Sequence, residues 1–254
     1  MIQSSTGYID LAQLVLYAFW IFFAGLVYYL HRENKREGYP LETERGPGAR
    51  VMVRGFPDVP PVKTFLSHDG TLKYNPSYAN DRSDVRITPA AEWPGAPYAP
   101  TGNPMLDAVG PASYAQREDK PELGIEGHPI LMPLRVATKH HIATEGPNPI
   151  GMKVFGCDGK VAGTVTDAWI DEAESMVRYL EVDIGARTVL LPNAMARVSN
   201  AKGVRVASIL AAQFVDVPAL KMPDVITKLE EDKIAAYFCG GHLYATPDRM
   251  GPLL

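Results

Sequence analysis

The sequence predicts a single N-terminal transmembrane α-helix and a mainly-β cytoplasmic domain, which contains a small β-barrel and a short C-terminal helix. Three observations predict this fold class. Residues 11–30 are apolar and carry no charge, residues 31–150 are rich in proline, and short alternating strand patterns begin at residue 151. The mean hydropathy of the 254 residues is -0.09, so the chain beyond the apolar stretch has the composition of a soluble protein that can bury a core.

The apolar stretch at residues 11–30, LAQLVLYAFWIFFAGLVYYL, has the length of a membrane span. Twenty helical residues at about 1.5 Å each reach roughly 30 Å, the thickness of the hydrocarbon core of a bilayer. A cleaved signal peptide would carry a basic start, a shorter apolar run and a small-residue cleavage site, and the sequence has none of these. We therefore predict a retained helix, since a helix satisfies its own backbone hydrogen bonds in lipid.

Charge sets the expected orientation of this helix. No lysine or arginine precedes it, whereas three basic residues follow it closely. The positive-inside rule then places residues 1–10 in the periplasm and residues 31–254 in the cytoplasm. Aromatic and basic side chains suit a membrane–water interface, and five of them stand at this end of the span: Tyr28, Tyr29, Arg32, Lys35 and Arg36.

The composition argues against some classes of partner. The formal net charge is -4, and the only basic run is the group that follows the span, which argues against binding to nucleic acid. Cys157 and Cys239 stand far apart and form neither a CxxC pair nor a metal-binding spacing. Free, buried thiols in a reducing compartment are the simplest interpretation, and they agree with the cytoplasmic placement.

Residues 31–150 are predicted to form an extended segment with few short strands. Seventeen of the 22 prolines lie in this region, and proline removes a backbone donor and fixes φ. Aromatic residues are spread through the region, which disfavours disorder, so we expect it to lie against a surface of this chain or of a partner. Within it, KTFLSHDGTLKY has Asp69-Gly70 at its middle, and this pair predicts a hairpin turn.

A small barrel or rolled sheet is predicted for residues 151–215. Asp158-Gly159 is a second turn signal between alternating arms, and TVLLP and GVRVASI continue the series of strands. In RYLEVDI the apolar residues alternate with others, which predicts a half-buried strand. About five short strands in roughly sixty residues are typical of a small barrel, and SILAAQF predicts a short helix after them.

Residues 216–254 are predicted to hold one helix. Thr227 and Glu230 have the spacing of a capping box, and EEDKIAAYFC follows with an acidic first turn that suits the positive end of a helix dipole. Gly240-Gly241 is predicted to end this helix.

The sequence predicts no catalytic residue and no metal site. It has no glycine-rich phosphate loop and no GxSxG, HExxH or CxxC motif, and no nucleophile is paired with a base. His140 and His141 are adjacent, and adjacent side chains point in different directions, so we do not expect them to share a metal ion. The chain is therefore predicted not to be an enzyme.

Two interpretations stay open for a group of acids and one histidine near the predicted barrel: Glu126, His128, Asp171, Glu172 and Glu174. These side chains can form a solvated rim. They can also form a proton path if water joins them and burial moves their pKa values toward neutrality.

Several motifs occur in an order that resembles a known family. They are REGYPLE after the span, APTGNPMLDAVGPASYA at residues 99–115, and then NPIGMKV, VTDAWID, RYLEV and LEEDKIAAYF. Together with the span, they resemble the H subunit of the photosynthetic reaction centre of purple bacteria over nearly the whole chain. The β region resembles a PRC-type β-barrel.

The resemblance implies a function. In this family the H subunit binds no pigment, packs its helix beside the L and M subunits in the inner (intracytoplasmic) membrane, and caps them on the cytoplasmic side. Bacteriochlorophyll, bacteriopheophytin, quinones and non-haem iron belong to L and M. Membrane lipid, a cytochrome subunit and an antenna complex are further expected partners, and the cap is expected to conduct protons toward the secondary quinone.

The resemblance also assigns roles to single residues. Asp171 is expected to relay protons, and Glu174 to be the last or nearly last donor outside the L subunit. Some relatives carry an acid and two histidines at alternate positions of the proton entry, where this chain has Gly124, Glu126 and His128. We therefore expect proton entry at Glu126 and His128 without a tight metal site.

Two alternatives to this interpretation are a membrane-tethered PRC-barrel adaptor outside photosynthesis and a membrane-anchored hydrolase. The adaptors lack a span combined with PTGNPMLDAVGPASYA, and the hydrolase lacks candidate catalytic residues.

Overall fold

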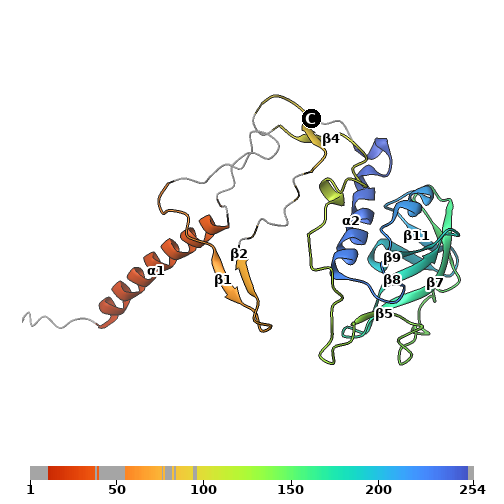
Figure 1. Ribbon diagram of the computed structural model, residues 1–254, viewed down its shortest axis with the longest axis horizontal. Helices are drawn as coiled ribbons and strands as arrows, with labels where there is room; N and C mark the ends of the chain where they lie inside the picture. Colours follow the sequence, from red (N-terminus) through yellow and green to blue (C-terminus); the bar gives the residue numbers. More distant parts are fainter. Residues whose placement is uncertain are drawn as a thin grey trace, which may run out of the picture. The chain divides into compact units, whose positions relative to one another are not determined.

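The computed structural model describes residues 11–37, 39, 55–75, 77, 82, 84–93 and 96–250 (Figure 1). The chain divides into two compact units, the first made of Met1–Asp81 with Trp93–Gly95 and the second of Arg82–Glu92 with Ala96–Leu254. The predicted periplasmic segment 1–10 and most of the Gly38–Glu42 motif lie outside the described residues.

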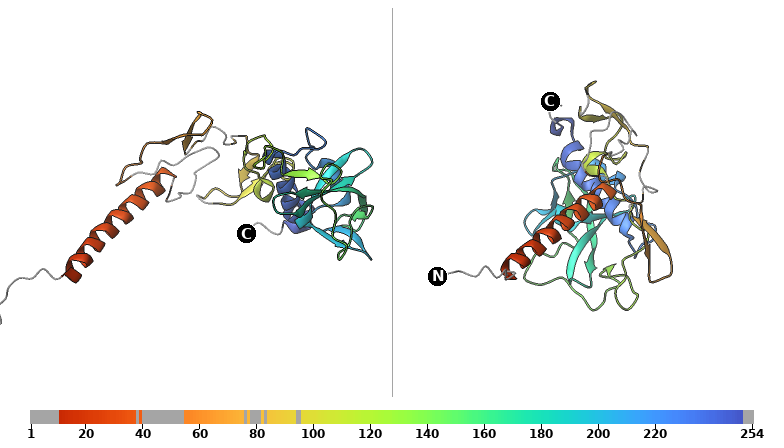
Figure 2. Two further views of the ribbon diagram at one scale, coloured as in Figure 1. Left: turned by 90° about the horizontal axis from the view of Figure 1, so that it is seen from below. Right: turned by 90° about the vertical axis from the view of Figure 1, so that its left-hand side faces the viewer.

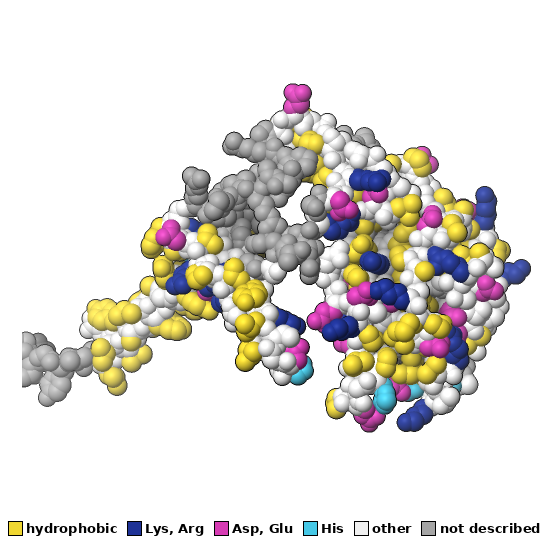
Figure 3. All heavy atoms as spheres, viewed as in Figure 1, with side chains coloured by type: hydrophobic (Ala, Val, Ile, Leu, Met, Phe, Trp, Pro, Cys, Tyr) yellow, Lys and Arg dark blue, Asp and Glu magenta, His cyan; other side chains and the backbone are white. Residues whose placement is uncertain are grey.

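The first unit contains one long apolar helix, α1 (Leu11–Arg36), whose length and composition suit a membrane span. Every side chain from Leu11 to Arg32 is exposed, and Figure 3 shows hydrophobic side chains along the whole helix. A helix that is apolar all round and uncovered belongs in lipid or against other apolar helices. The predicted N-terminal apolar helix is present, and it continues six residues beyond residue 30.

The C-terminal end of α1 is tied to the chain that follows it. The Lys35 side chain is buried, and its Nζ donates to the carbonyl oxygens of Gly55 and Pro57, the latter at 2.7 Å. Glu33, on the same turn, forms an ion pair with Lys63. These contacts satisfy two of the three N–H donors of the Lys35 ammonium group.

A β-hairpin completes the first unit. Strands β1 (Lys63–Leu66) and β2 (Leu72–Asn75) pair antiparallel, and Gly70 in the turn has φ of 80°. The Asp69 carboxylate accepts a hydrogen bond from the backbone N–H of Thr71 at 3.0 Å. The hairpin predicted from Asp69-Gly70 is confirmed, because glycine adopts a positive φ without steric cost and aspartate stabilises the turn.

The second unit is built on a curled seven-stranded sheet with the order β10-β11-β6-β7-β8-β9, in which β5 pairs with β7 beside this path (Figures 1 and 2). All neighbouring strands pair antiparallel except β11 and β6, which are parallel. The strands are β5 (Leu131–Pro133), β6 (Lys153–Phe155), β7 (Val161–Asp171), β8 (Met176–Asp183), β9 (Thr188–Pro192), β10 (Ala196–Ser199) and β11 (Gly203–Val206). The second hairpin turn is confirmed, with Gly159 at φ of 73° between β6 and β7.

The hydrophobic core lies between this sheet and α2 (Lys228–Tyr244). Trp169 of β7, Leu180 of β8 and Phe238 of α2 are fully buried. The Phe238 ring meets that of Phe214 edge-on, with 5.8 Å between the ring centroids. Phe214 belongs to the 3-10 helix η3 (Ala211–Asp216), which occupies the end of the predicted helix SILAAQF.

The remaining short elements are strands β3 (Ile87–Pro89) and β4 (Tyr98–Pro100), which pair with each other, and the 3-10 helices η1 (Gly110–Ala112), η2 (Asn193–Met195) and η4 (Pro247–Arg249).

Strand β8 departs from the predicted half-buried pattern. Leu180 and Val182 are buried as expected, but Tyr179 and Glu181 on the opposite face are buried as well. Tyr179 meets a residue of α2, and Glu181 meets Arg135 from the segment before the barrel. Alternation in one strand does not reveal that a second layer covers its polar face.

The end of α2 also differs from the prediction. Its capping box is present, with Thr227 Oγ1 accepting from the N–H of Glu230 and the Glu230 carboxylate accepting from the N–H of Thr227 at 2.8 Å. The helix does not end at Gly240-Gly241 but continues to Tyr244. A Cβ on Gly240 would lie 2.5 Å from the Cβ of Ala112, so this glycine allows close packing between α2 and η1 rather than ending the helix.

The second half of the Pro-rich segment packs on its own barrel. Met105 and Leu131 are buried in the same core as the strands, and η1 contacts α2. The segment was expected to lie against a surface of this chain or of a partner. For residues 96–150 that surface belongs to the chain itself.

Candidate functional site

The turn between β7 and β8 carries both acids that were singled out for proton transfer. Asp171 ends β7, and its Oδ1 accepts hydrogen bonds from the backbone N–H groups of Ala173 at 3.0 Å and Glu174 at 3.1 Å. Ser175 closes the turn with φ of 53°. The side chain of Asp171 therefore sets the backbone path that presents Glu174.

Arg178 of β8 joins the two acids. Its guanidinium donates to Asp171 Oδ2 from Nε and Nη2, both at 3.2 Å, and to Glu174 Oε2 from Nη2 at 2.7 Å. Asp171 is only 6% exposed, whereas the Glu174 side chain is 57% exposed. Burial lowers the pKa of Arg178, but the hydrogen bond to Asp171 and the charge of Glu174 outweigh it and raise that pKa.

A second acidic group lies on the α2 side of the same strand. The Tyr179 hydroxyl of β8 donates to Glu231 Oε2 at 3.2 Å. Burial raises the pKa of both the phenol and the carboxyl, and Glu231 also feels the charges of Glu122 and Arg178. Glu231 is thus a partly buried carboxyl whose pKa is raised and which accepts a hydrogen bond from Tyr179.

The predicted entry residues lie on an exposed hairpin next to this turn. Leu123 and Pro129 form a bridge, and the N–H of Ile130 donates to the carbonyl of Glu122 at 3.0 Å. The N–H of Glu172 donates to the carbonyl of Ile130 at 2.8 Å, which joins this hairpin to the β7–β8 turn. We define the relay cluster by the acidic and aromatic side chains and the arginine at this end of the sheet: Glu122, Asp171, Glu174, Arg178, Tyr179 and Glu231.

Glu126 and His128 are fully solvent-facing at the tip of the hairpin. Their backbone is brought beside the cluster, but within residues 96–250 no hydrogen bond or ion pair joins either side chain to Asp171 or Glu174.

His140 and Glu172 flank the turn on its other side. His140 Nδ1 lies 4.0 Å from Glu172 Oε1 and is buried without a hydrogen-bond partner. The neighbouring His141 is exposed. Among the residues that the structure describes, no three histidine, cysteine or acidic side chains are grouped so that they could hold a metal ion.

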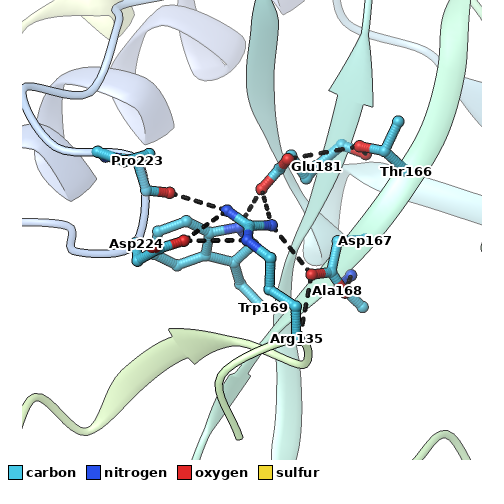
Figure 4. A network of polar contacts seen from close by, with 8 residues as sticks. All are labelled: Arg135, Thr166, Asp167, Ala168, Trp169, Glu181, Pro223 and Asp224. Carbon is cyan, nitrogen blue, oxygen red and sulfur yellow. Dashed lines mark hydrogen bonds and ion pairs between the residues drawn. The ribbon is translucent and has the colours of Figure 1, made fainter.

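A separate polar network around Arg135 has a structural character (Figure 4). Arg135 Nη1 donates to Asp167 Oδ2 at 3.0 Å and to Glu181 Oε2 at 2.8 Å, and Glu181 Oε2 also accepts from Trp169 Nε1 at 2.9 Å. The guanidinium further binds Asp224 and the carbonyl of Pro223.

In this network each carboxylate accepts at least one hydrogen bond from Arg135. Burial lowers the pKa of Arg135, but its hydrogen bonds to Glu181, Asp224 and Asp167 and the charge of Glu181 outweigh burial and raise that pKa. A network of this kind holds β7 and β8 to the segments before and after the barrel.

Sequence reasoning found Asp171 and Glu174 but missed Arg178, Tyr179 and Glu231. A signal for Arg178 exists, because a basic residue on the second strand of a predicted hairpin can reach acids in its turn. Glu231 has no local signal, since its contact with Tyr179 spans 52 residues.

Two family models match the chain. Residues 3–136 match the model described as the H-chain N-terminal region of the photosynthetic reaction centre, and residues 144–211 match the PRC-barrel domain. The first match covers α1, the β1–β2 hairpin and the segment through β5, and the second covers β6 to β11.

An uncharacterized protein of Deinococcus radiodurans is 28% identical to this chain over 115 residues, which are 41% of the chain and 42% of that protein. The chain therefore spans less than half the length of this relative, which carries no functional description.

Proposed function

The chain belongs to the H-chain family of the photosynthetic reaction centre, whose model matches more than half of it, and from this premise we propose two roles for it. The first role is to cap and stabilise the L and M subunits on the cytoplasmic side of the membrane. The second is to conduct protons toward the secondary quinone during light-driven electron transfer. The family's H chain is a structural subunit that binds no pigment.

The capping role is supported by α1 and by the family match together. A lone helix with an uncovered apolar surface has two stable environments, which are lipid and the apolar faces of neighbouring helices. In the proposed complex, L and M hold the bacteriochlorophylls, bacteriopheophytins, quinones and non-haem iron. The N-terminus lies in the periplasm, and the second unit lies in the cytoplasm below the inner (intracytoplasmic) membrane of a purple bacterium.

The single observation that carries the proton-conducting role is the arrangement of the relay cluster. Asp171 is buried, Glu174 is exposed, and one guanidinium holds both. An exposed acid on the outer turn can meet a partner protein, while the buried acid behind it is shielded from bulk water. A carboxylate that must be reprotonated during a reaction needs a donor within hydrogen-bond reach or one water away.

The proposed route starts at Glu126 and His128 on the exposed hairpin. From there protons pass to Glu122 and Glu231, whose raised pKa allows it to hold a proton nearer neutral pH than an ordinary glutamate. Asp171 then relays the proton to Glu174, which delivers it across the interface. Arg178 keeps both acids in place and does not itself release a proton, since arginine stays charged.

The match to the H-chain model favours this function over a membrane-tethered PRC-barrel adaptor. That alternative shares the span and the barrel but not the region between them, and the H-chain match extends from residue 3 through that region to residue 136.

The proton-conducting role predicts that Glu174→Gln slows the second electron transfer to the secondary quinone. Glutamine keeps the shape of the side chain and cannot carry a proton, so we expect a loss of about tenfold or more, typical of the removal of a positioned proton donor. The measurement is the rate after a second light flash in purified complexes at several pH values.

Glu145→Gln is the matched control, because Glu145 is an exposed acid in the same unit outside the cluster. A Glu174→Gln rate equal to that of wild type across the pH range would assign Glu174 to the solvated rim.

A further inference from the structure

The outer face of strands β6, β10 and β11 carries only positive charge. Lys153, Arg197, Lys202 and Arg205 are all exposed there, and we call these four residues the cationic face. They stand out in a chain whose formal net charge is -4.

Strand register places these side chains on one side of the sheet. Arg197 and Arg205 are directly opposite each other in the β10–β11 pair. Arg205 is also the partner of Phe155 in the parallel β11–β6 pair, and Lys153 shares the side of Phe155 because side chains alternate. Like charges directly opposite each other in a sheet are destabilising, so the fold alone gives no reason for this pairing.

No acid compensates the cationic face. Within residues 96–250, none of its four side chains forms an ion pair with a carboxylate. Asp158 is the nearest acid along β6, and its Oδ1 accepts from the backbone N–H groups of Lys160 and Ala211 and not from a side chain of the cationic face. The positive charges of this face can therefore bind negatively charged groups of another molecule.

The same face has a shallow, open hollow of about 500 Å³. Its lining includes Met152, Phe155 and Gly203 beside Lys153, Lys202 and Arg205, and it holds no acidic residue. Val161, paired with Phe155, is 53% exposed beside it. Apolar and arginine side chains in a broad, open surface are typical of protein interfaces, whereas small anions are held in enclosed sites.

We propose that the cationic face docks an acidic surface of another protein. A second copy of this chain does not fit in a two-fold arrangement, because Arg197 and Arg205 would meet their own copies. Charge complementarity favours a partner with exposed Asp and Glu around a small apolar patch.

An anionic lipid surface is the competing partner, and the length of β7 argues against it. Lys153 pairs with Thr164, seven residues from Asp171 along β7, which at about 3.3 Å per residue puts the two ends roughly 20 Å apart. This step rests on the proposed function, in which Asp171 faces the membrane-embedded core. The cationic face is then separated by that distance from the turn that faces the core, which favours a soluble partner over the lipid around the core.

The experiment uses the full chain in its purified complex at low ionic strength, with fluorescent poly-L-glutamate as the acidic probe. The variant Arg197→Glu/Arg205→Glu reverses two charges of the face. Lys120→Glu/Lys139→Glu is the control, since it changes the net charge equally at exposed lysines elsewhere in the second unit. We expect about tenfold weaker binding in the first variant, because two attractive contacts become repulsive, and less than a twofold change in the control.

Equal weakening in both variants would overturn the proposal, because binding of the polymer would then depend only on the net charge of the chain and not on the cationic face. It would also be overturned if wild type bound vesicles rich in phosphatidylglycerol but not the polymer, or if inorganic phosphate displaced the polymer beyond the effect of chloride at equal ionic strength. The charge-reversed variant should keep the wild-type rate of electron transfer to quinone, and Glu174→Gln should bind the polymer normally. The two proposals can therefore fail separately.

Discussion

At the scale of single residues, Asp171 combines two tasks in one carboxylate. One oxygen holds the turn by accepting two backbone N–H groups, and the other receives Arg178. Glu174 depends on the first of these bonds for its position and on Arg178 for its charge balance. A substitution at Asp171 therefore disturbs the turn itself and would confuse a test of the proposed proton transfer, whereas Glu174 can be changed with less disturbance of the backbone.

Glu231 predicts a pH dependence of stability. Burial raises its pKa in the folded chain, so the folded state binds this proton more tightly than the unfolded state does. Its contribution to stability is complete below the unfolded pKa, about 4.3 for an ordinary glutamate, and is lost as pH rises through the folded pKa. Glu231→Gln cannot ionise, and its amide oxygen can still accept from Tyr179.

We therefore expect Glu231→Gln to melt at a higher temperature than wild type near pH 7, with the difference shrinking toward pH 4. Thermal unfolding of the full chain in detergent across this range measures it. Glu92→Gln, at an exposed position of the same unit, serves as the control. A difference between Glu231→Gln and wild type that is independent of pH would show that the carboxyl is not destabilised by burial.

At the scale of elements, short-range signals predicted the turns and the helix start. Asp69-Gly70, Asp158-Gly159 and the Thr227–Glu230 capping box each act within four residues, and the structure has all three. The interpretation of Gly240-Gly241 was wrong because the reason for these glycines is distant, with Ala112 packed against the first and the Ser208 backbone against the second.

The same limit explains what could be predicted of the candidate site. Asp171 and Glu174 share one turn and were found from the sequence, but the burial of Tyr179 and Glu181 on β8 depends on α2 and on Arg135, far away in the chain. The alternation of residues in a strand predicts which face packs on the core. It does not show whether another element covers the opposite face.

The contact between α2 and η1 predicts the effect of Gly240→Ala. Alanine gains about 1 kcal/mol over glycine in an exposed helix interior. Here the added Cβ would lie 2.5 Å from that of Ala112 and 3.1 Å from its Cα, so the helix must shift. Overpacking of this kind costs about 1–3 kcal/mol and outweighs the gain.

Chemical denaturation of the full chain in detergent measures this loss. Gly146→Ala is the matched control, since nothing lies within 4 Å of a Cβ there, and its effect should stay within about 0.5 kcal/mol of zero. If Gly240→Ala is as stable as wild type, the close approach of α2 to η1 does not exist in solution.

At the scale of the whole molecule, the two units have different physical needs. The first unit exposes the apolar surface of α1, whereas the second buries its own core between the sheet and α2. A chain without α1 should therefore keep the fold of the second unit and lose its attachment to pigment-bearing partners.

The test is affinity purification from photosynthetic membranes by a C-terminal tag, followed by a near-infrared absorption spectrum. The full chain should carry bacteriochlorophyll absorption, and a chain lacking residues 1–37 should be colourless while keeping a cooperative thermal transition. A colourless eluate with the full chain would refute membership of a reaction-centre complex in these cells.

Strand β5 affects whether the barrel can fold as an isolated domain. It comes from outside residues 144–211, yet its backbone pairs with Trp169, Ile170 and Asp171 at the end of β7. Excising the barrel at residues 144–211 would leave this edge of β7 with unpaired backbone hydrogen-bonding groups beside Asp171. The barrel domain expressed alone would therefore not keep the β7–β8 turn intact, because the region before it supplies strand β5.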